Sequence, residues 1–159
     1  MCVLLLVTLT QAQALAGTCA KRADQQPAPQ ITELKFSDFY QMPIGPAGLT
    51  PTETLTRAQG KRVCLMGYMV KRESPSAGQL MLTPVPVEMS EHADGEADDL
   101  PATTVTVLLS PSQRTWRVPQ ASGLVAITGL LHVGRHESED GRISWIQLEL
   151  TEPLPTSIF

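Results

Sequence analysis

The sequence predicts a mainly β fold with one short helix, in a chain long enough for a single domain with its own core. Three observations support this prediction. Thirteen prolines and eleven glycines in 159 residues divide the chain into short segments, as expected where turns are frequent. The segments after Gly60 are apolar and contain β-branched and aromatic residues. One of them, Thr103–Leu109, alternates threonine with valine, which is typical of a half-buried strand.

Residues 1–16 have the features of a secretory signal peptide. An apolar run, Val3–Val7, precedes Ala12-Gln13-Ala14 and Ala14-Leu15-Ala16, and both triplets carry the small residues that a signal peptidase requires. The run is too short to span a bilayer as a helix. Cleavage after residue 16 or 20 would leave a periplasmic or secreted protein without a transmembrane span. A buried N-terminal strand is the alternative.

The segment 17–30 is polar and rich in proline and alanine, which indicates a linker ahead of a single domain at 31–155. Thr18 separates Cys19 from the small residues before it, so a soluble product is favoured over a lipoprotein. Cys64 lies in an apolar stretch, where it is expected to be a small core residue. A Cys19–Cys64 disulfide is the alternative.

The first elements of the domain are expected to be short. Residues 31–40 are predicted to form a short strand or a packing arm. Residues 51–59 are predicted to form a helix, since Thr50 can cap it, Pro51 suits its first position and Glu53 can complete a capping box. Gly60 is expected to end this helix.

Five strands are predicted after the helix, and two of them share a glycine. The predicted strands are 63–70, 79–83, 103–109, 124–133 and 143–150. Gly67 and Gly129 occupy equivalent places in the first and the fourth, where a glycine indicates a bulge or a sharply coiled strand. Long coiled strands close a small five-stranded barrel, so we predict an OB-like barrel. An antiparallel β-sandwich is the alternative.

The segment Gly60–Val70 (G-K-R-V-C-L-M-G-Y-M-V) resembles the G-K-x-V-x-L-x-G-[YF]-M-V opening of exported bacterial domains of uncharacterised function that are thought to be OB-like. The resemblance covers residues 36–82 and implies export and fold, but no catalytic residue. The chain departs from those domains where an acidic segment at 88–102 replaces their Cys- and Pro-rich stretch. Residues 110–122 also offer no helix between the third and fourth strands.

The net charge of −4 is concentrated in the acidic segment. Six acidic residues and no basic one lie between Glu88 and Asp99, and the rest of the chain is nearly neutral. The sequence therefore gives no electrostatic case for nucleic-acid binding. Basic pairs bracket the first strand, and together with two aromatic residues they form the predicted ligand face: Lys61, Arg62, Tyr68, Lys71, Arg72 and Trp145.

Two sets of residues could hold a metal, although a solvated loop and flexible core filler are the expected roles. Carboxylates suit Ca²⁺, and the acidic set is Glu91, His92, Asp94, Glu96, Asp98 and Asp99. Sulfur ligands suit Cu(I), and the soft set is Cys64, Met66, Met69, Met81, Met89 and His92. His132 and His136 are expected to lie about 13 Å apart on one strand, too far for one metal.

No catalytic or phosphate-binding motif is recognised in the sequence. We therefore predict a non-enzymatic periplasmic binding or adaptor module without a cofactor, whose partner is a protein or a small ligand of the cell envelope. A metal-handling protein that uses the acidic set for calcium or the soft set for copper is the alternative.

Overall fold

The computed structural model describes residues 30–89, 91–92, 95–96, 100–138 and 141–158. The predicted signal peptide at 1–16, Cys2 and Cys19 lie outside the described residues, and so does the linker up to residue 29. No helix in the described part of the chain is long and apolar enough to cross a membrane.

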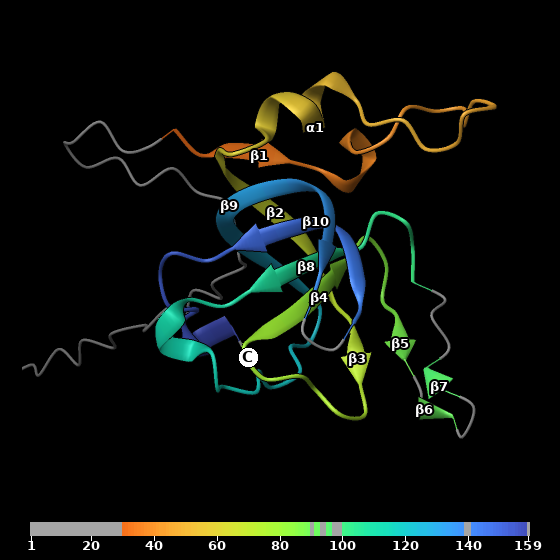
Figure 1. Ribbon diagram of the computed structural model, residues 1–159. Helices are drawn as coiled ribbons and strands as arrows, with labels where there is room; N and C mark the ends of the chain where they lie inside the picture. The colour runs from red at the N-terminus through yellow and green to blue at the C-terminus, as the bar shows by residue number, and fades with distance from the viewer. Residues whose placement is uncertain (1–29, 90, 93–94, 97–99, 139–140, 159) are drawn as a thin grey trace, which may run out of the picture.

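The fold is mainly β, with one short helix and a mixed sheet (Figure 1). The strands of the six-stranded sheet, in spatial order, are β1 (Thr32–Leu34), β2 (Arg62–Met69), β4 (Gln79–Thr83), β8 (Val105–Leu108), β10 (Ile143–Glu149) and β9 (Leu124–Glu137). β9 also pairs with β2, which closes β2, β4, β8, β10 and β9 into a ring. The ring is only partly closed, because β2 and β4 pair at Tyr68 and Met69 alone.

The sheet has one strand more than the predicted five-stranded barrel, and the extra strand, β1, lies in the segment 31–40 that was expected to be a short strand or a packing arm. β1 pairs in parallel with Val63–Leu65, at the half of β2 that β4 leaves unpaired. Four short strands form two further pairs: β3 (Lys71–Arg72) with β5 (Glu88–Met89), and β6 (Glu91–His92) with β7 (Gly95–Glu96). Short 3₁₀ turns lie at Phe36–Asp38, Pro111–Gln113 and Thr156–Ile158.

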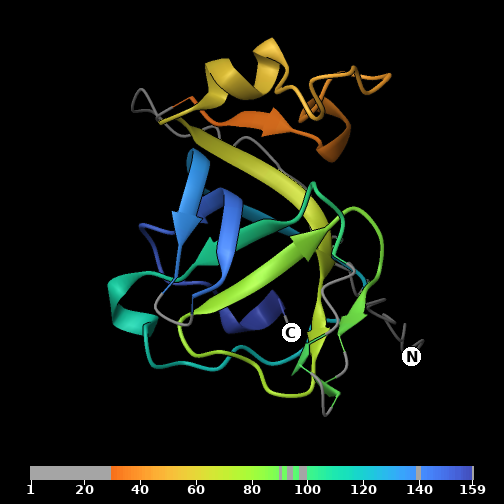
Figure 2. The same cartoon turned by 45° about the vertical axis from the view of Figure 1, so that its right-hand side comes forward.

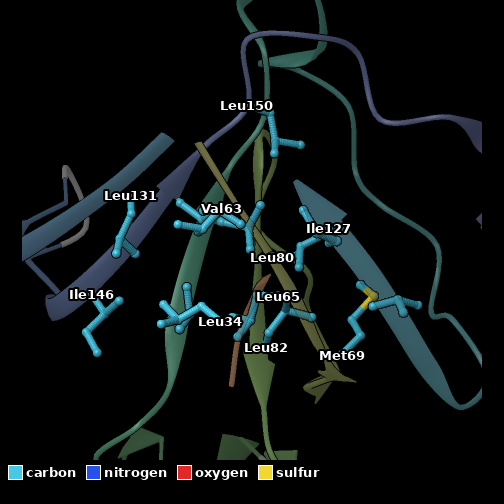
Figure 3. Close-up of a cluster of buried hydrophobic side chains, with 14 of the residues drawn as sticks. Leu34, Val63, Leu65, Met69, Leu80, Leu82, Ile127, Leu131, Ile146 and Leu150 are labelled. Carbon is cyan, nitrogen blue, oxygen red and sulfur yellow. The ribbon is translucent and has the colours of Figure 1, made fainter. Parts of the chain in front are cut away.

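The main hydrophobic core fills the inside of the ring (Figure 3). Alternate residues of each strand point inward, among them Leu80 and Leu82 of β4 and Ile146 and Leu148 of β10, and all are buried. Leu34 of β1 joins the same core. Burial of these apolar side chains is the main stabilising term of the fold.

The helix α1 (Glu53–Ala58) covers one end of the ring beside β1 (Figure 2). It begins two residues later than predicted, and Thr52 rather than Thr50 is its cap: the Leu55 amide donates to Thr52 Oγ1 at 3.1 Å. The reason is that Pro51 is held in a β-bridge with Tyr40, so the chain is still extended there. Leu55 is buried in the core.

Gly67 and Gly129 are needed for close approach, not for an unusual backbone conformation. Neither has a positive φ. A Cβ on Gly67 would lie 2.8 Å from the Phe36 ring, and one on Gly129 would lie 2.7 Å from the carbonyl oxygen of Glu149. These glycines therefore let neighbouring segments pack directly against β2 and β9.

Candidate ligand-binding face

The outer surface of β4 and β8, on the side away from the ring core, is itself covered. Met81 is 6% exposed and Thr106 is 8% exposed, although the strand alternation points both away from the core. Met81 packs with Val70 and Met89 in a second, smaller hydrophobic cluster, against which Leu100 lies. This finding corrects the prediction that the third strand is half-buried, because an outer layer covers its threonine face.

A small cavity opens between this outer surface and the segments around it. It measures about 30 Å³, and its walls include Arg72, Ser76, Met81, Thr106, Arg142 and Ser144. By this measure one water needs roughly 10–15 Å³, so the cavity has room for about two waters. Residues with hydroxyl and guanidinium groups thus line the cavity together with the apolar side chain of Met81.

Two arginines come to this cavity from different parts of the chain. Arg72 ends β3, and its Nη1 donates to Ser76 Oγ at 2.7 Å. Arg142 precedes β10, and its carbonyl accepts hydrogen bonds from the amide and the hydroxyl of Ser138, both at 2.9 Å. Burial, and then the positive charge of Arg72, lower the pKa of Arg142. The positive charge of Arg72 is thus close enough to act electrostatically on the guanidinium of Arg142.

A second cavity of about 160 Å³ adjoins the first. The two share Met81, Thr106, Arg142 and Ser144 as lining residues. The second cavity is also lined by Ile143 and Trp145, and Trp145 is 58% exposed. We call the two cavities together the outer-face site. It combines fixed hydrogen-bond donors with an exposed flat aromatic surface.

A third hollow, about 500 Å³ and more open, lies beside Tyr68, Lys71, Glu88 and Gln120. Lys71 Nζ and a carboxylate oxygen of Glu88 are 2.7 Å apart, so the lysine charge is paired across β3 and β5. The Gln120 amide donates to the Met69 carbonyl. The charged groups of this hollow are thus engaged with each other.

The structure divides the predicted ligand face among the start of β2, the third hollow and the outer-face site, and the third hollow shares Met69 and Gln120 with the first cavity. Lys61 and Arg62 lie at the start of β2, where Arg62 contacts Glu152 at 3.4 Å. Tyr68 and Lys71 line the third hollow. Arg72 and Trp145 line the two cavities of the outer-face site.

Arg142 is the residue that sequence reasoning missed. Arg142 directly follows Asp140-Gly141, a dipeptide typical of a tight turn. Its position beside this turn was the one clue in the sequence that it could belong to a site. The covered threonine face of β8 gave no clue, because alternation with valine also fits an exposed face.

The predicted metal ligands are for the most part not brought together in the described residues. Asp94, Asp98 and Asp99 lie outside those residues, and Glu91, His92 and Glu96 are described only as a backbone hairpin. In the part of the chain that is described, no three His, Cys, Asp or Glu side chains are grouped to hold a metal. The methionines are dispersed: Met66 is exposed, Met69 lies in the ring core, and Met81 and Met89 lie in the second cluster.

The expected 13 Å between His132 and His136 is wrong. Their ring centroids are 6.2 Å apart. The register between β9 and β10 shifts between Ser144 and Ile146, and Gly134, between the histidines, has a φ of 138°. This irregularity shortens the strand path and brings the rings together. His132 Nε2 also lies 3.3 Å from a carboxylate oxygen of Glu149.

Cys64 is buried, as the apolar pattern predicts, but its role is not that of simple core filler. It is buried but lies outside both hydrophobic clusters, and it is disulfide-bonded. Val63 and Leu65, its neighbours, point into the core. Cys64 therefore faces outward from the ring.

Comparison with known proteins finds no matching family model and no matching curated protein. Among solved structures, a DUF3299 family protein from Pseudomonas aeruginosa is similar to this chain. The two are 16% identical, the match covers 80% of this chain and 97% of that one, and the TM-score is 0.44. This likeness indicates no ligand and no activity.

Proposed function

We propose that this protein is a non-enzymatic binding module of the bacterial cell envelope, which holds a small ligand at the outer-face site of an OB-like barrel. The observation that carries this proposal is that two adjoining cavities share one face. Arg72 and Arg142 line the first cavity, and Arg142 and Trp145 line the second. Concave sites with an apolar floor and a few converging polar groups are where proteins hold small ligands.

The order of the strands supports the OB-like description. The ring runs β2–β4–β8–β10–β9, with β8 and β10 parallel and the other neighbours antiparallel. This is the order of a five-stranded, partly open Greek-key barrel. The continuous pairing of β2 with β9, from Arg62–Leu130 to Tyr68–Leu124, argues against a sandwich, since it joins what would be separate sheets.

The disulfide of Cys64 supports a place in the cell envelope. Disulfides persist in oxidising compartments such as the periplasm and are rare in the cytosol, and Cys64 is disulfide-bonded. The apolar run at residues 3–7 and the small-residue triplets after it point the same way. Loss of residues 1–16 from protein recovered in the periplasmic fraction tests this part, because cleavage there keeps Cys19, whereas cleavage after residue 20 would remove both other cysteines of the chain. An intact N-terminus in the cytosol would contradict it.

The chemistry of the lining groups favours binding over catalysis. Hydroxyls and guanidiniums donate hydrogen bonds, and an indole offers a stacking surface. Arginine keeps its proton at neutral pH, so Arg72 and Arg142 are poorly suited to act as general bases. The site is therefore proposed to recognise its ligand and release it unchanged.

Backbone amide NMR of the full chain, titrated with a set of neutral and charged aromatic fragments, tests the proposal. We expect shift changes to gather at Thr106, Ser144 and Trp145. Trp145→Ala should weaken the binding of aromatic fragments, and Met66→Ala, which removes an exposed apolar side chain elsewhere on the ring, should not. Shift changes gathered at Tyr68 and Lys71, or binding unchanged in Trp145→Ala, would contradict the proposal.

A further inference from the structure

His132 and His136 place two imidazole rings side by side on β9. Their ring centroids are 6.2 Å apart, and the ring planes meet at 78°. In a regular strand, residues four apart are separated by about 13 Å, so the irregular stretch around Gly134 creates the pair. Leu131 is buried in the ring core and Val133 packs against it, so His132 between them points away from the core. The histidine pair therefore lies on the outside of the ring.

One nitrogen of each ring has no hydrogen-bond partner among the described residues. These nitrogens are the Nε2 atoms of His132 and His136, and both are buried. A carboxylate oxygen of Glu149 lies 3.3 Å from His132 Nε2, but the two atoms do not form a hydrogen bond. Buried polar atoms are almost always paired, and an unpaired one indicates a missing water, ion or other ligand. Two such nitrogens on neighbouring rings indicate one ligand that satisfies both.

The distances suit a metal ion bound by imidazole. With metal–nitrogen bonds of about 2.0–2.1 Å, two imidazoles that share an ion have their ring centroids roughly 5–6 Å apart. The observed 6.2 Å is slightly wider, so a small rotation of the two rings brings both Nε2 atoms to one ion. Neighbouring ligand atoms of a tetrahedral ion are roughly 3.3 Å apart, so an ion on His132 would also lie within reach of the Glu149 carboxylate. The His132 and Glu149 side chains are 29% and 52% exposed, so an ion can reach them from solvent.

We propose that His132 and His136 together bind a divalent transition-metal ion through their Nε2 atoms, with the Glu149 carboxylate beside the ion to offset its charge. No three ligand side chains are grouped around one point in the described ranges, so the two imidazoles hold the ion and water completes its coordination. Imidazole suits Zn²⁺, Ni²⁺ and Cu²⁺, whereas Ca²⁺ and Mg²⁺ bind oxygen ligands. None of these three residues lines either cavity of the outer-face site, so the inference does not depend on the proposed function.

Calorimetric titration of the full chain with Ni²⁺, Zn²⁺ and Ca²⁺ tests the inference. We expect Ni²⁺ and Zn²⁺ to bind, and Ca²⁺ not to compete with Ni²⁺. His132→Gln and His136→Gln should each weaken Ni²⁺ binding roughly tenfold or more, because the remaining imidazole loses the advantage of a second ligand held close by. His92→Gln is the matched control at the third histidine of the chain, and it should leave the affinity unchanged. Glu149→Gln should weaken binding by a smaller factor, since only a neighbouring charge is lost.

Paramagnetic Cu²⁺ locates the ion on the unaltered chain, so the test does not depend on whether a variant folds. We expect the amide NMR signals of His132, His136 and Glu149 to broaden first. Broadening centred on the acidic segment at 88–102 instead would overturn the inference. Ni²⁺ binding that His92→Gln weakens as much as His132→Gln, or a lack of any Ni²⁺ and Zn²⁺ binding, would also overturn it. The proposed binding function of the outer-face site would stand in each case.

Discussion

The inner and outer faces of β4 and β8 are both buried, yet they differ in chemistry. Inside the ring, Leu80, Leu82, Val105 and Val107 make an apolar core. Outside, Met81 and Thr106 lie beneath cavities that also expose guanidinium and hydroxyl groups. The same two strands thus serve two purposes, because the inner face closes the ring and the outer face supports the proposed ligand site.

This difference between the two faces predicts whether a substitution should change the stability of the fold or the binding of a ligand. Removing an inner side chain leaves a void in a close-packed core, so the fold should lose stability. Removing an outer polar group should leave the ring intact and change what the surface binds. The four predictions that follow test this division, from the largest expected effect on stability to the smallest.

Leu82→Ala should lower the free energy of unfolding by about 2–5 kcal/mol, because Leu82 is fully buried in the ring core. Val85→Ala, at an exposed position just beyond β4, is the control and should change stability by less than about 0.5 kcal/mol. Urea denaturation followed by circular dichroism measures both. Equal effects of the two substitutions would mean that β4 does not face a packed interior.

Gly129→Val should destabilise the ring by roughly 1–3 kcal/mol, as overpacking does. Any Cβ there meets the Glu149 carbonyl oxygen and the Leu148 side chain. Gly45→Val is the control, because nothing lies within 4 Å of a Cβ built there. Thermal melts compare the two. An unchanged midpoint in Gly129→Val would show that β9 and β10 do not approach as closely as described.

Gln113→Ala should cost about 1–2 kcal/mol, since two hydrogen bonds are lost. The Gln113 side chain donates to the Leu154 carbonyl at 2.9 Å and accepts from the Leu154 amide at 2.7 Å. Leu154 belongs to the ring core, so this polar clamp secures an inner residue. Gln41→Ala, at an exposed glutamine, is the control for urea denaturation. A loss no larger than that of the control would mean that the clamp does not stabilise the fold.

Arg142→Met should have the smallest effect on stability, within about 0.5 kcal/mol of the unaltered protein. Arg142 lines the outer cavities and is not part of the ring core, so its replacement by another long side chain should leave the ring intact. Urea denaturation measures the change. A loss of several kcal/mol would place Arg142 among the residues that hold the ring together, and the division between the two faces would fail.

The inner face was the predictable part of this protein. The alternation of Ile146, Leu148 and Leu150 against Trp145 in the sequence predicts which side of β10 is buried, and the structure agrees. Periodicity was sufficient there because the core contacts only one side of each strand. The prediction of a β-rich fold with one short helix is confirmed on the same basis.

The outer-face site could not be predicted in full, because it depends on contacts between distant segments. Arg72 and Trp145 were among the predicted ligand residues, but Arg142 was not, and Lys61 and Arg62 lie at the other end of β2. The distance predicted between His132 and His136 was wrong, because no local sequence pattern indicates the shift in register between β9 and β10. A short strand was one expectation for residues 31–40, but its place in the sheet depends on how much of β2 is left unpaired by β4.

A crystal of the full chain soaked in 4-bromobenzoate tests the central claim most directly. The bromine gives an anomalous signal that locates the ring, and the electron density locates the carboxylate. We predict the bromine beside Trp145, with the rest of the compound in the outer-face site beside Thr106 and Ser144. Bromine beside Tyr68 and Lys71 instead, or no bromine at any ordered position while calorimetry shows binding, would contradict the outer-face site.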